Sequence, residues 1–160
     1  MENKLTGKSS LYIKILAISL ALLSMAFSVF MYSRGHDKNR TLMYFPCYDG
    51  DGLFCEPRYF AKAADSQAAV TAFVNDLLLG PMTNRYSPIF PMGTKAEYCF
   101  ISADDSEGQR LYLGLSRDAL FAGDLLSVRE GVDLLRLNIV KNFTYLNKID
   151  VAIDGISVYE

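Results

Sequence analysis

The side chains best suited to acid–base or metal chemistry are few in this sequence. His36 is the single histidine, and its neighbours are charged: Arg34, Asp37 and Lys38. A general base or a metal ligand needs partners held in a fixed geometry, and a short charged linker does not supply them. We therefore expect a solvated His36, and a Ser-His-Asp set elsewhere would need a second histidine.

Acidic residues beside glycines are the next candidates for a metal site. Asp49, Asp51 and Asp154 each flank a glycine, and Asp-Gly-Asp-Gly resembles part of a calcium loop. The twelfth position counted from Asp49 is Phe60, however, where a calcium loop closes with a bidentate glutamate. We expect turns at these positions and no metal site.

A second acidic group, Asp104, Asp105 and Glu107, has the residue types that a glycoside hydrolase uses as paired acids. The polar stretch ending at Gly108 is more typical of a solvated hairpin turn, which is the favoured interpretation. The sequon Asn142-Phe-Thr144 falls inside a predicted helix, so we interpret it as a chance match.

The three cysteines leave two interpretations open. Cys47 and Cys55 flank the turn-rich stretch Tyr48–Gly52, and a disulfide between them is conceivable in an oxidising compartment. The favoured alternative is that all three, including Cys99, are small buried apolar side chains. No CxxC pair and no neighbouring histidine supports a zinc or thiol site.

The loop from Tyr86 to Met92 (YSPIFPM) is apolar and stiffened by proline. A rigid loop loses little entropy on binding, which would suit a contact surface. The favoured alternative is that Ile89 and Phe90 turn inward and join the core.

Leu11–Ser33 is a run of 23 residues with a single charge, Lys14. A bilayer core of about 30 Å is crossed by about 20 helical residues. An uncleaved signal anchor is favoured over a cleaved signal peptide, because the run is long and no clear A-x-A site follows. We expect a cytoplasmic tail, a transmembrane anchor, a linker and an extracytoplasmic domain over 1–10, 11–33, 34–40 and 41–160.

Charge separates the two parts of the chain. The first 40 residues carry a net charge of +4, whereas residues 41–160 hold 10 Lys and Arg against 16 Asp and Glu, a net of −6. An acidic domain is repelled by phosphate backbones, so nucleic-acid binding is not expected. The basic residues balance on either side of the apolar run, so the orientation rests on the short N-terminal tail.

Periodicity predicts the order β-β-α-β-β-α-β-β after the apolar run. Strands are expected over residues 41–47, 53–61, 95–103, 110–115, 149–153 and 156–159. One helix starts at Asp65 or Ser66 and ends at Gly80-Pro81, and a second starts at the capping box of Ser127 and Glu130. The second apolar stripe comprises Val132, Leu135, Ile139, Phe143 and Leu146. This order indicates a single small α+β domain, with a mixed or antiparallel sheet covered by two helices and preceded by one transmembrane helix.

Several short motifs occur in an order that resembles the GerMN domain of sporulation and germination proteins. They are Leu77-Leu-Leu-Gly-Pro81, Pro91-Met-Gly-Thr94, Leu113-Gly-Leu-Ser116, the helix Leu135–Asn142 and Ile149-Asp-Val-Ala-Ile-Asp-Gly155. The resemblance covers about Thr41 to Tyr159. It implies a non-enzymatic domain of the bacterial envelope, on the outer side of the cytoplasmic membrane, related to ring-building modules that pack through sheet edges and helices.

We therefore expect an assembly or scaffolding module of a sporulation- or cell-wall-related process, without catalytic residues, cofactors or metal ions. Its expected partners are other envelope proteins or further copies of itself, the membrane through one helix, and peptidoglycan. The alternative is an envelope domain that binds or acts on peptidoglycan, with acids such as Asp104, Asp118 or Asp124 at work.

Overall fold

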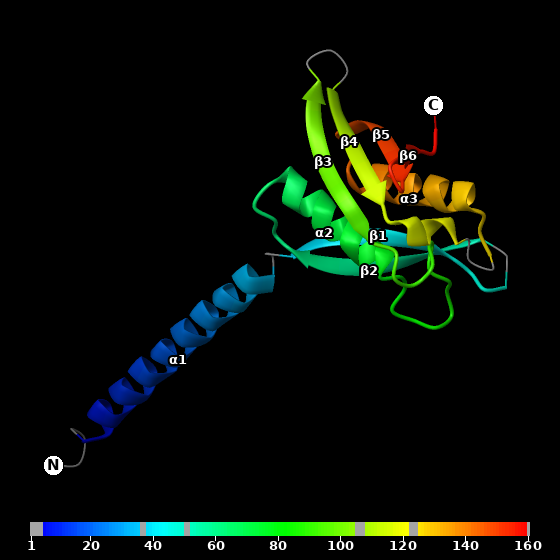
Figure 1. Cartoon of the computed structure of the whole chain (residues 1–160). Coiled ribbons are helices and arrows are strands. Elements are labelled where there is room, and N and C mark those ends of the chain that lie inside the picture. Colours follow the sequence, from blue (N-terminus) through cyan, green and yellow to red (C-terminus); the bar gives the residue numbers. More distant parts are fainter. Residues whose placement is uncertain (1–4, 36–37, 50–51, 105–107, 122–124, 160) are drawn as a thin grey trace. The chain divides into compact units, whose positions relative to one another are not determined.

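The structure is a computed structural model that describes residues 5–35, 38–49, 52–104, 108–121 and 125–159. The chain separates into two units, Met1–Asn39 and Arg40–Glu160. Helix α1, Leu5–Gly35, makes up most of the first unit (Figure 1). The second unit contains the predicted succession of strands and helices.

Helix α1 is long and apolar enough to cross a membrane. Its segment Tyr12–Tyr32 has a mean hydropathy of 2.2 and none of it is buried against protein. Three serines within it donate their hydroxyls to carbonyls of the same helix, at 2.8–2.9 Å: Ser19, Ser24 and Ser28. Since a bilayer supplies no water to unpaired polar groups, these bonds suit a membrane anchor. A signal sequence near the N-terminus has the same properties.

The first strand of the domain overlaps the predicted linker 34–40. Strand β1 is Lys38–Pro46, so residues 38–40 belong to it. Its partner β2, Leu53–Ala61, is also nine residues long and has the predicted bounds. β1 thus includes the polar residues Lys38, Asn39 and Arg40 at its start. Together β1 and β2 form a two-stranded sheet, where a single sheet had been expected.

Helix α2, Ser66–Leu78, begins and ends as its sequence predicts. The Asp65 carboxylate accepts the Ala68 amide at 2.7 Å, which caps the helix. Gly80 follows with φ +89°, a left-handed conformation that glycine adopts without steric cost. The buried face comprises Val70, Phe73, Val74, Leu77 and Leu78.

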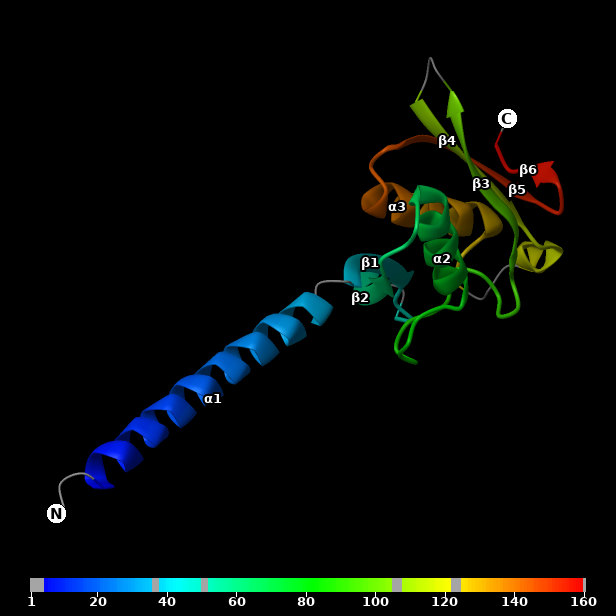
Figure 2. The ribbon, with the colours of Figure 1, turned by 90° about the vertical axis from the view of Figure 1, so that its left-hand side faces the viewer.

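A four-stranded sheet, in the order β3-β4-β5-β6, completes the domain. The strands are Ala96–Asp104, Gly108–Leu115, Leu146–Ile153 and Ile156–Ser157. β4 and β5 are parallel and the other pairs antiparallel, so the sheet is mixed. Its register places apolar pairs such as Leu111–Ile149 and Leu113–Val151 side by side. Helices α2 and α3 lie on one face of this sheet, as Figure 2 shows.

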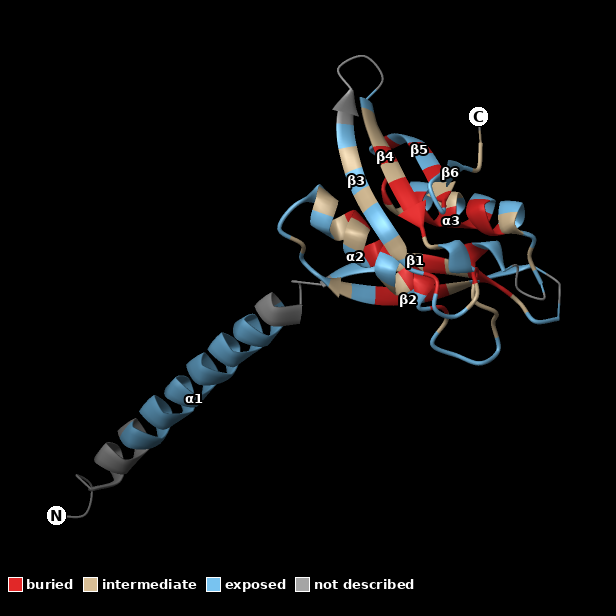
Figure 3. Cartoon of the chain, viewed as in Figure 1, coloured by how far each residue is buried: buried red, intermediate tan, exposed pale blue. Residues whose placement is uncertain are grey.

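Helix α3, Val128–Asn142, carries the predicted capping box. The Ser127 hydroxyl accepts the Glu130 amide, and the Glu130 carboxylate accepts the Ser127 amide at 2.8 Å. The helix stops at Asn142, so Leu146 begins β5 instead of extending the helical stripe. A short 3₁₀ turn, η2, Arg117–Leu120, lies between β4 and α3. The buried side chains concentrate where helices and sheets face each other, as Figure 3 shows. The α+β fold class is thus confirmed.

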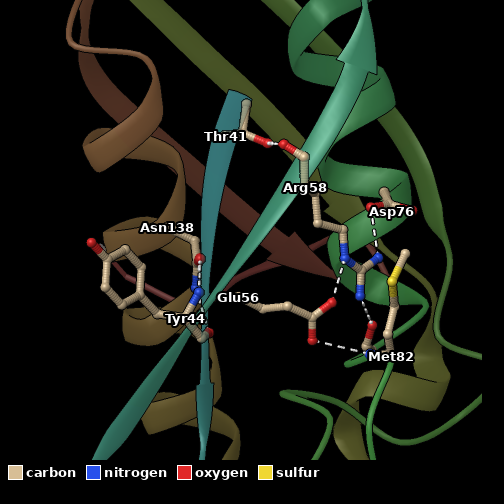
Figure 4. A network of polar contacts seen from close by, with 8 residues as sticks. Thr41, Tyr44, Glu56, Arg58, Asp76, Met82 and Asn138 are labelled. Atoms are coloured by element: carbon tan, nitrogen blue, oxygen red, sulfur yellow. Dashed lines mark hydrogen bonds and ion pairs between the residues drawn. The ribbon is translucent and has the colours of Figure 1, made fainter. Parts of the chain in front are cut away.

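Side-chain amides take the place of a neighbouring strand along β1. Asn138 of α3 accepts the Tyr44 amide at 2.7 Å and donates to the Tyr44 carbonyl at 3.0 Å (Figure 4). One helical turn later, Asn142 makes the same pair of bonds with Leu42, at 3.0 and 2.7 Å. Asn142 of the glycosylation-like sequon is therefore engaged in the fold. The amide and the carbonyl of Tyr44 and of Leu42 are thus all hydrogen-bonded to side chains of α3. These bonds hold β1 against the helix without a third strand.

Candidate interaction surface

A buried ion network fixes the loop that follows α2. Arg58 is 6% exposed and donates in three directions: to Glu56 at 2.9 Å, to Asp76 at 2.7 Å and to the Gly80 carbonyl at 2.7 Å (Figure 4). Glu56 in turn accepts the Met82 amide at 3.1 Å. The planar guanidinium suits such a fork of fixed acceptors. The network therefore holds both sides of Pro81.

The same loop is fastened to the β1–β2 hairpin further along. The Ser87 amide donates to the Pro46 carbonyl at 2.9 Å, and Cys47 pairs with Tyr86 in an isolated antiparallel bridge. The Tyr86 ring stacks on Phe54, with centroids 4.0 Å apart and planes 6° from parallel. The segment from Gly80 to Ser87 is thus held at both ends although it has no regular secondary structure.

Beyond Ser87, the loop is anchored in the core. Ile89 and Phe90 are 5% and 4% exposed, which confirms the prediction that they turn inward. Phe90 packs against Gly131 of α3, where an added Cβ would lie 3.1 Å from its ring and 3.3 Å from the Ile89 carbonyl. Glycine at this position thus permits the close approach of loop and helix.

A pocket of about 220 Å³ lies between this loop and the hairpin. Most of its walls come from aromatic, proline and apolar side chains: Tyr48, Leu79, Pro81, Tyr86, Pro88 and Met92. Thr83 and Asn84 supply the remaining polar groups. We call this cavity the loop pocket. All of its lining residues within the described part of the chain are uncharged.

Apolar side chains project into solvent around the loop pocket. Leu79 and Met92 are 79% and 89% exposed, and Met82, next to Pro81, is 75% exposed. Rigid backbone beneath exposed apolar side chains is typical of a contact surface, because little entropy is lost on binding. The contact-surface interpretation of the loop therefore applies to its exposed residues, while its centre belongs to the core.

The outer face of the four-stranded sheet carries a row of aromatic side chains that pack on one another. Phe100 and Tyr112 are stacked with centroids 5.0 Å apart, Tyr98 lies 6.0 Å from Phe100, and the Arg110 guanidinium lies 5.9 Å from the Tyr112 ring. Arg110 also pairs with Asp150 at 3.4 Å. Each of these rings has at least one intramolecular ring or guanidinium neighbour, although Tyr98 and Phe100 remain 41% and 48% exposed.

Of the acids proposed for glycoside chemistry, the two that the structure describes, Asp104 and Asp118, are not brought together. Asp118 lies in η2, where it accepts the Ser116 hydroxyl at 3.3 Å, and Ser116 pairs with Lys95 just before β3. Asp104 ends β3, so about 27 Å of strand separates the two. The predicted turns hold at Asp49 and Asp154, both exposed. Four other candidates lie outside the described residues: Asp51, Asp105, Glu107 and Asp124.

The remaining predicted site residues are His36 and the three cysteines. His36 lies outside the described residues, and within the described part of the chain no three His, Cys, Asp or Glu side chains are grouped as metal ligands. Cys47, Cys55 and Cys99 are free thiols and half-buried, so neither the disulfide nor full burial is observed. Burial raises the pKa of the Cys99 thiol, which favours its neutral, unreactive form.

Comparison with known proteins identifies the fold. The chain matches the tandem GerMN domains of the sporulation protein GerM from Bacillus subtilis with a TM-score of 0.53 and 11% identity, over 77% of this chain and 42% of that one. The globular unit has the fold of a GerMN domain. This chain thus spans less than half of the tandem GerMN structure.

Two further solved structures are similar at lower scores. The first GerMN domain of Bacillus subtilis GerM gives a TM-score of 0.49 and 12% identity, over 75% of this chain and 87% of that one. A proposed lipoprotein of Clostridium perfringens gives 0.45 and 19% identity, over 74% and 76%. No protein-family model matches the sequence, and neither does any curated protein.

The sequence analysis did not identify the residues that hold the loop pocket of this GerMN-like domain in place. Glu56 and Arg58 were not singled out, because a charged pair in a strand is usually solvent-exposed. The signal available was their placement two residues apart on one face of a predicted strand, alternating with Cys55, Pro57 and Tyr59. Two charges on the inward face need partners, and they pair with each other and with the half-buried Asp76.

Proposed function

We propose that this chain is a membrane-anchored envelope protein whose GerMN-like domain lies outside the cytoplasm and acts as a non-enzymatic protein-interaction module. The observation that carries the proposal is the loop pocket. Exposed apolar side chains surround it, and hydrogen bonds of buried groups hold the loop beneath them. An unpartnered apolar surface of this kind is costly in water unless another molecule covers it.

The other features of the chain agree with this role. Helix α1 supplies a candidate anchor, and the fold likeness to the GerMN domains of a sporulation protein suggests a process of sporulation or of the cell wall. The acidic residues that the sequence offers for glycoside chemistry are not paired among the described residues. Partners of the domain are expected to be other envelope proteins or further copies of itself.

Site-specific photocrosslinking in cells tests the proposal. A photoreactive amino acid at Met92 of the full-length chain should give a discrete crosslinked species, because this side chain is 89% exposed beside the loop pocket. The matched control is Ile156, which is 73% exposed on the short strand β6 and does not line the pocket. Equal, diffuse labelling from both positions, or none, would refute an interaction at this surface. Cosedimentation of the protein with purified sacculi tests the rival peptidoglycan-binding role.

A further inference from the structure

The size of the loop pocket limits what can occupy it. At about 220 Å³ it is smaller than the roughly 300–1,000 Å³ of small-molecule and cofactor sites. It therefore suits one or two side chains of a partner polypeptide better than a metabolite. This step rests on the proposed interaction role of the domain.

Charge narrows the choice further. Residues 41–160 carry a net charge of −6, yet the described side chains that line the loop pocket are uncharged. A charged side chain entering it would lose hydration without gaining an ion pair, at a considerable cost in free energy. The lining therefore favours uncharged side chains at the positions of the partner that enter the pocket.

The polar groups of the pocket are of the kind that binds an extended backbone. Tyr48, Tyr86 and Asn84 carry hydroxyl and amide hydrogens that can be donated to carbonyls. Tyr86 is held by its stack on Phe54, so its ring is fixed before binding. A polyproline II segment makes no internal hydrogen bonds and leaves its carbonyls free, and grooves lined with aromatic side chains recognise it.

We propose that the loop pocket binds a proline-rich, uncharged segment of a partner envelope protein in the polyproline II conformation. Proline rings pack against Tyr48, Tyr86 and the flanking Pro81 and Pro88, and Asn84 donates to a carbonyl of the segment. The partner's preformed extended conformation and the pinned loop keep the entropic cost of binding low.

Fluorescence anisotropy with labelled peptides and the full-length protein in nanodiscs tests this proposal. A proline decamer should bind, and a glycine–serine decamer should not. Tyr48→Ala and Asn84→Ala should each weaken binding of the proline decamer by at least about fivefold. Tyr59→Ala is the matched control, since Tyr59 is 64% exposed on β2 and does not line the pocket.

Asn84 is exposed, so its replacement tests recognition with little effect on folding. Equal affinity of both peptides, or unchanged binding by both pocket variants, would overturn the proposal. If the proline decamer fails to bind while Met92 still gives a discrete crosslink, the partner class is wrong and the interaction role stands. If both experiments fail, the interaction role is wrong as well.

Discussion

Replacing Asn138 with leucine tests whether side-chain amides hold β1 in place. Asn138 is fully buried, and it is hydrogen-bonded to both the amide and the carbonyl of Tyr44. Leucine has nearly the same volume but leaves these two backbone groups without their partner. The substitution thus removes the hydrogen bonds while largely preserving the packing of α3.

The expected loss of stability follows from the Tyr44 amide and carbonyl, which lose their hydrogen-bond partner. Each buried, unpaired backbone group costs about 1–3 kcal/mol, and the added apolar side chain recovers up to about 1.5 kcal/mol. Taking the middle of the first range, about 2 kcal/mol for each of the two groups, we expect the free energy of unfolding to fall by about 2.5–4 kcal/mol. Asn138 also donates to the Leu134 carbonyl at 3.0 Å, a weaker loss because that carbonyl remains inside the helix.

Hydrogen exchange of the full-length protein in nanodiscs measures this effect directly. Exchange of the Tyr44 amide should accelerate by about 70- to 1,000-fold. Asn142→Leu should have a smaller effect, because Asn142 is only half-buried and water can reach Leu42. Asn75→Leu on the exposed side of α2 is the matched control, expected to stay within about 0.5 kcal/mol. Unchanged Tyr44 exchange in Asn138→Leu would refute the reasoning.

Three further predictions concern charge and protonation. Arg58→Leu should lower the free energy of unfolding by about 3–5 kcal/mol, because it leaves the buried Glu56 carboxylate without its ion-pair partner. The double variant with Glu56→Leu should recover much of this loss in the same exchange assay. An additive loss in the double variant would contradict the prediction. The hydroxyl and the amide of Ser127 lower the pKa of the Glu130 carboxyl in the folded protein. The helix cap therefore stabilises the fold above the pKa that Glu130 has in the unfolded chain. This stabilisation is lost as the pH falls through the pKa of Glu130 in the folded protein. Amide hydrogen exchange at the start of α3 should therefore accelerate in acid more than it does in the Ser127→Ala variant. Parallel pH profiles of the two proteins would exclude this role of the helix cap. Because burial raises the pKa of Cys99, its alkylation should be slower in the folded protein than in urea, and equal rates by mass spectrometry would disprove it.

Local chemistry made part of the fold predictable. The Asp65 cap, the Ser127–Glu130 capping box and the Gly80 helix end each depend on residues within a few positions of one another. The bonds that join distant segments were not predictable in this way. Asn138 meets Tyr44 across 94 residues of sequence, and an isolated asparagine in a helix gives no sign of such a partner.

The same limit explains the errors at element ends. Apolar spacing continued the helical stripe to Leu146, but α3 ends at Asn142 and Leu146 begins β5. The loop pocket was only half anticipated. Its sequence predicted that Ile89 and Phe90 turn inward, but not that Phe90 packs on α3 where Gly131 has no side chain.

The edges of the sheets bear on how this domain meets other proteins. Asn138 and Asn142 occupy the free side of β1, and Gln67 of α2 does the same for β3 by accepting the Ile101 amide at 2.7 Å and donating to the Cys99 carbonyl. β2 contains Pro57, which has no amide hydrogen, and β6 has two residues. Such features oppose the addition of a foreign strand.

The resemblance to ring-building modules implied packing through sheet edges as well as helices. Among the described strands, the covered edges make that route unfavourable, since a partner strand would first have to displace satisfied hydrogen bonds. Contacts made by side chains carry no such cost. The loop pocket, with its pinned backbone and exposed Leu79 and Met92, is therefore the surface of the domain where we expect a partner to bind.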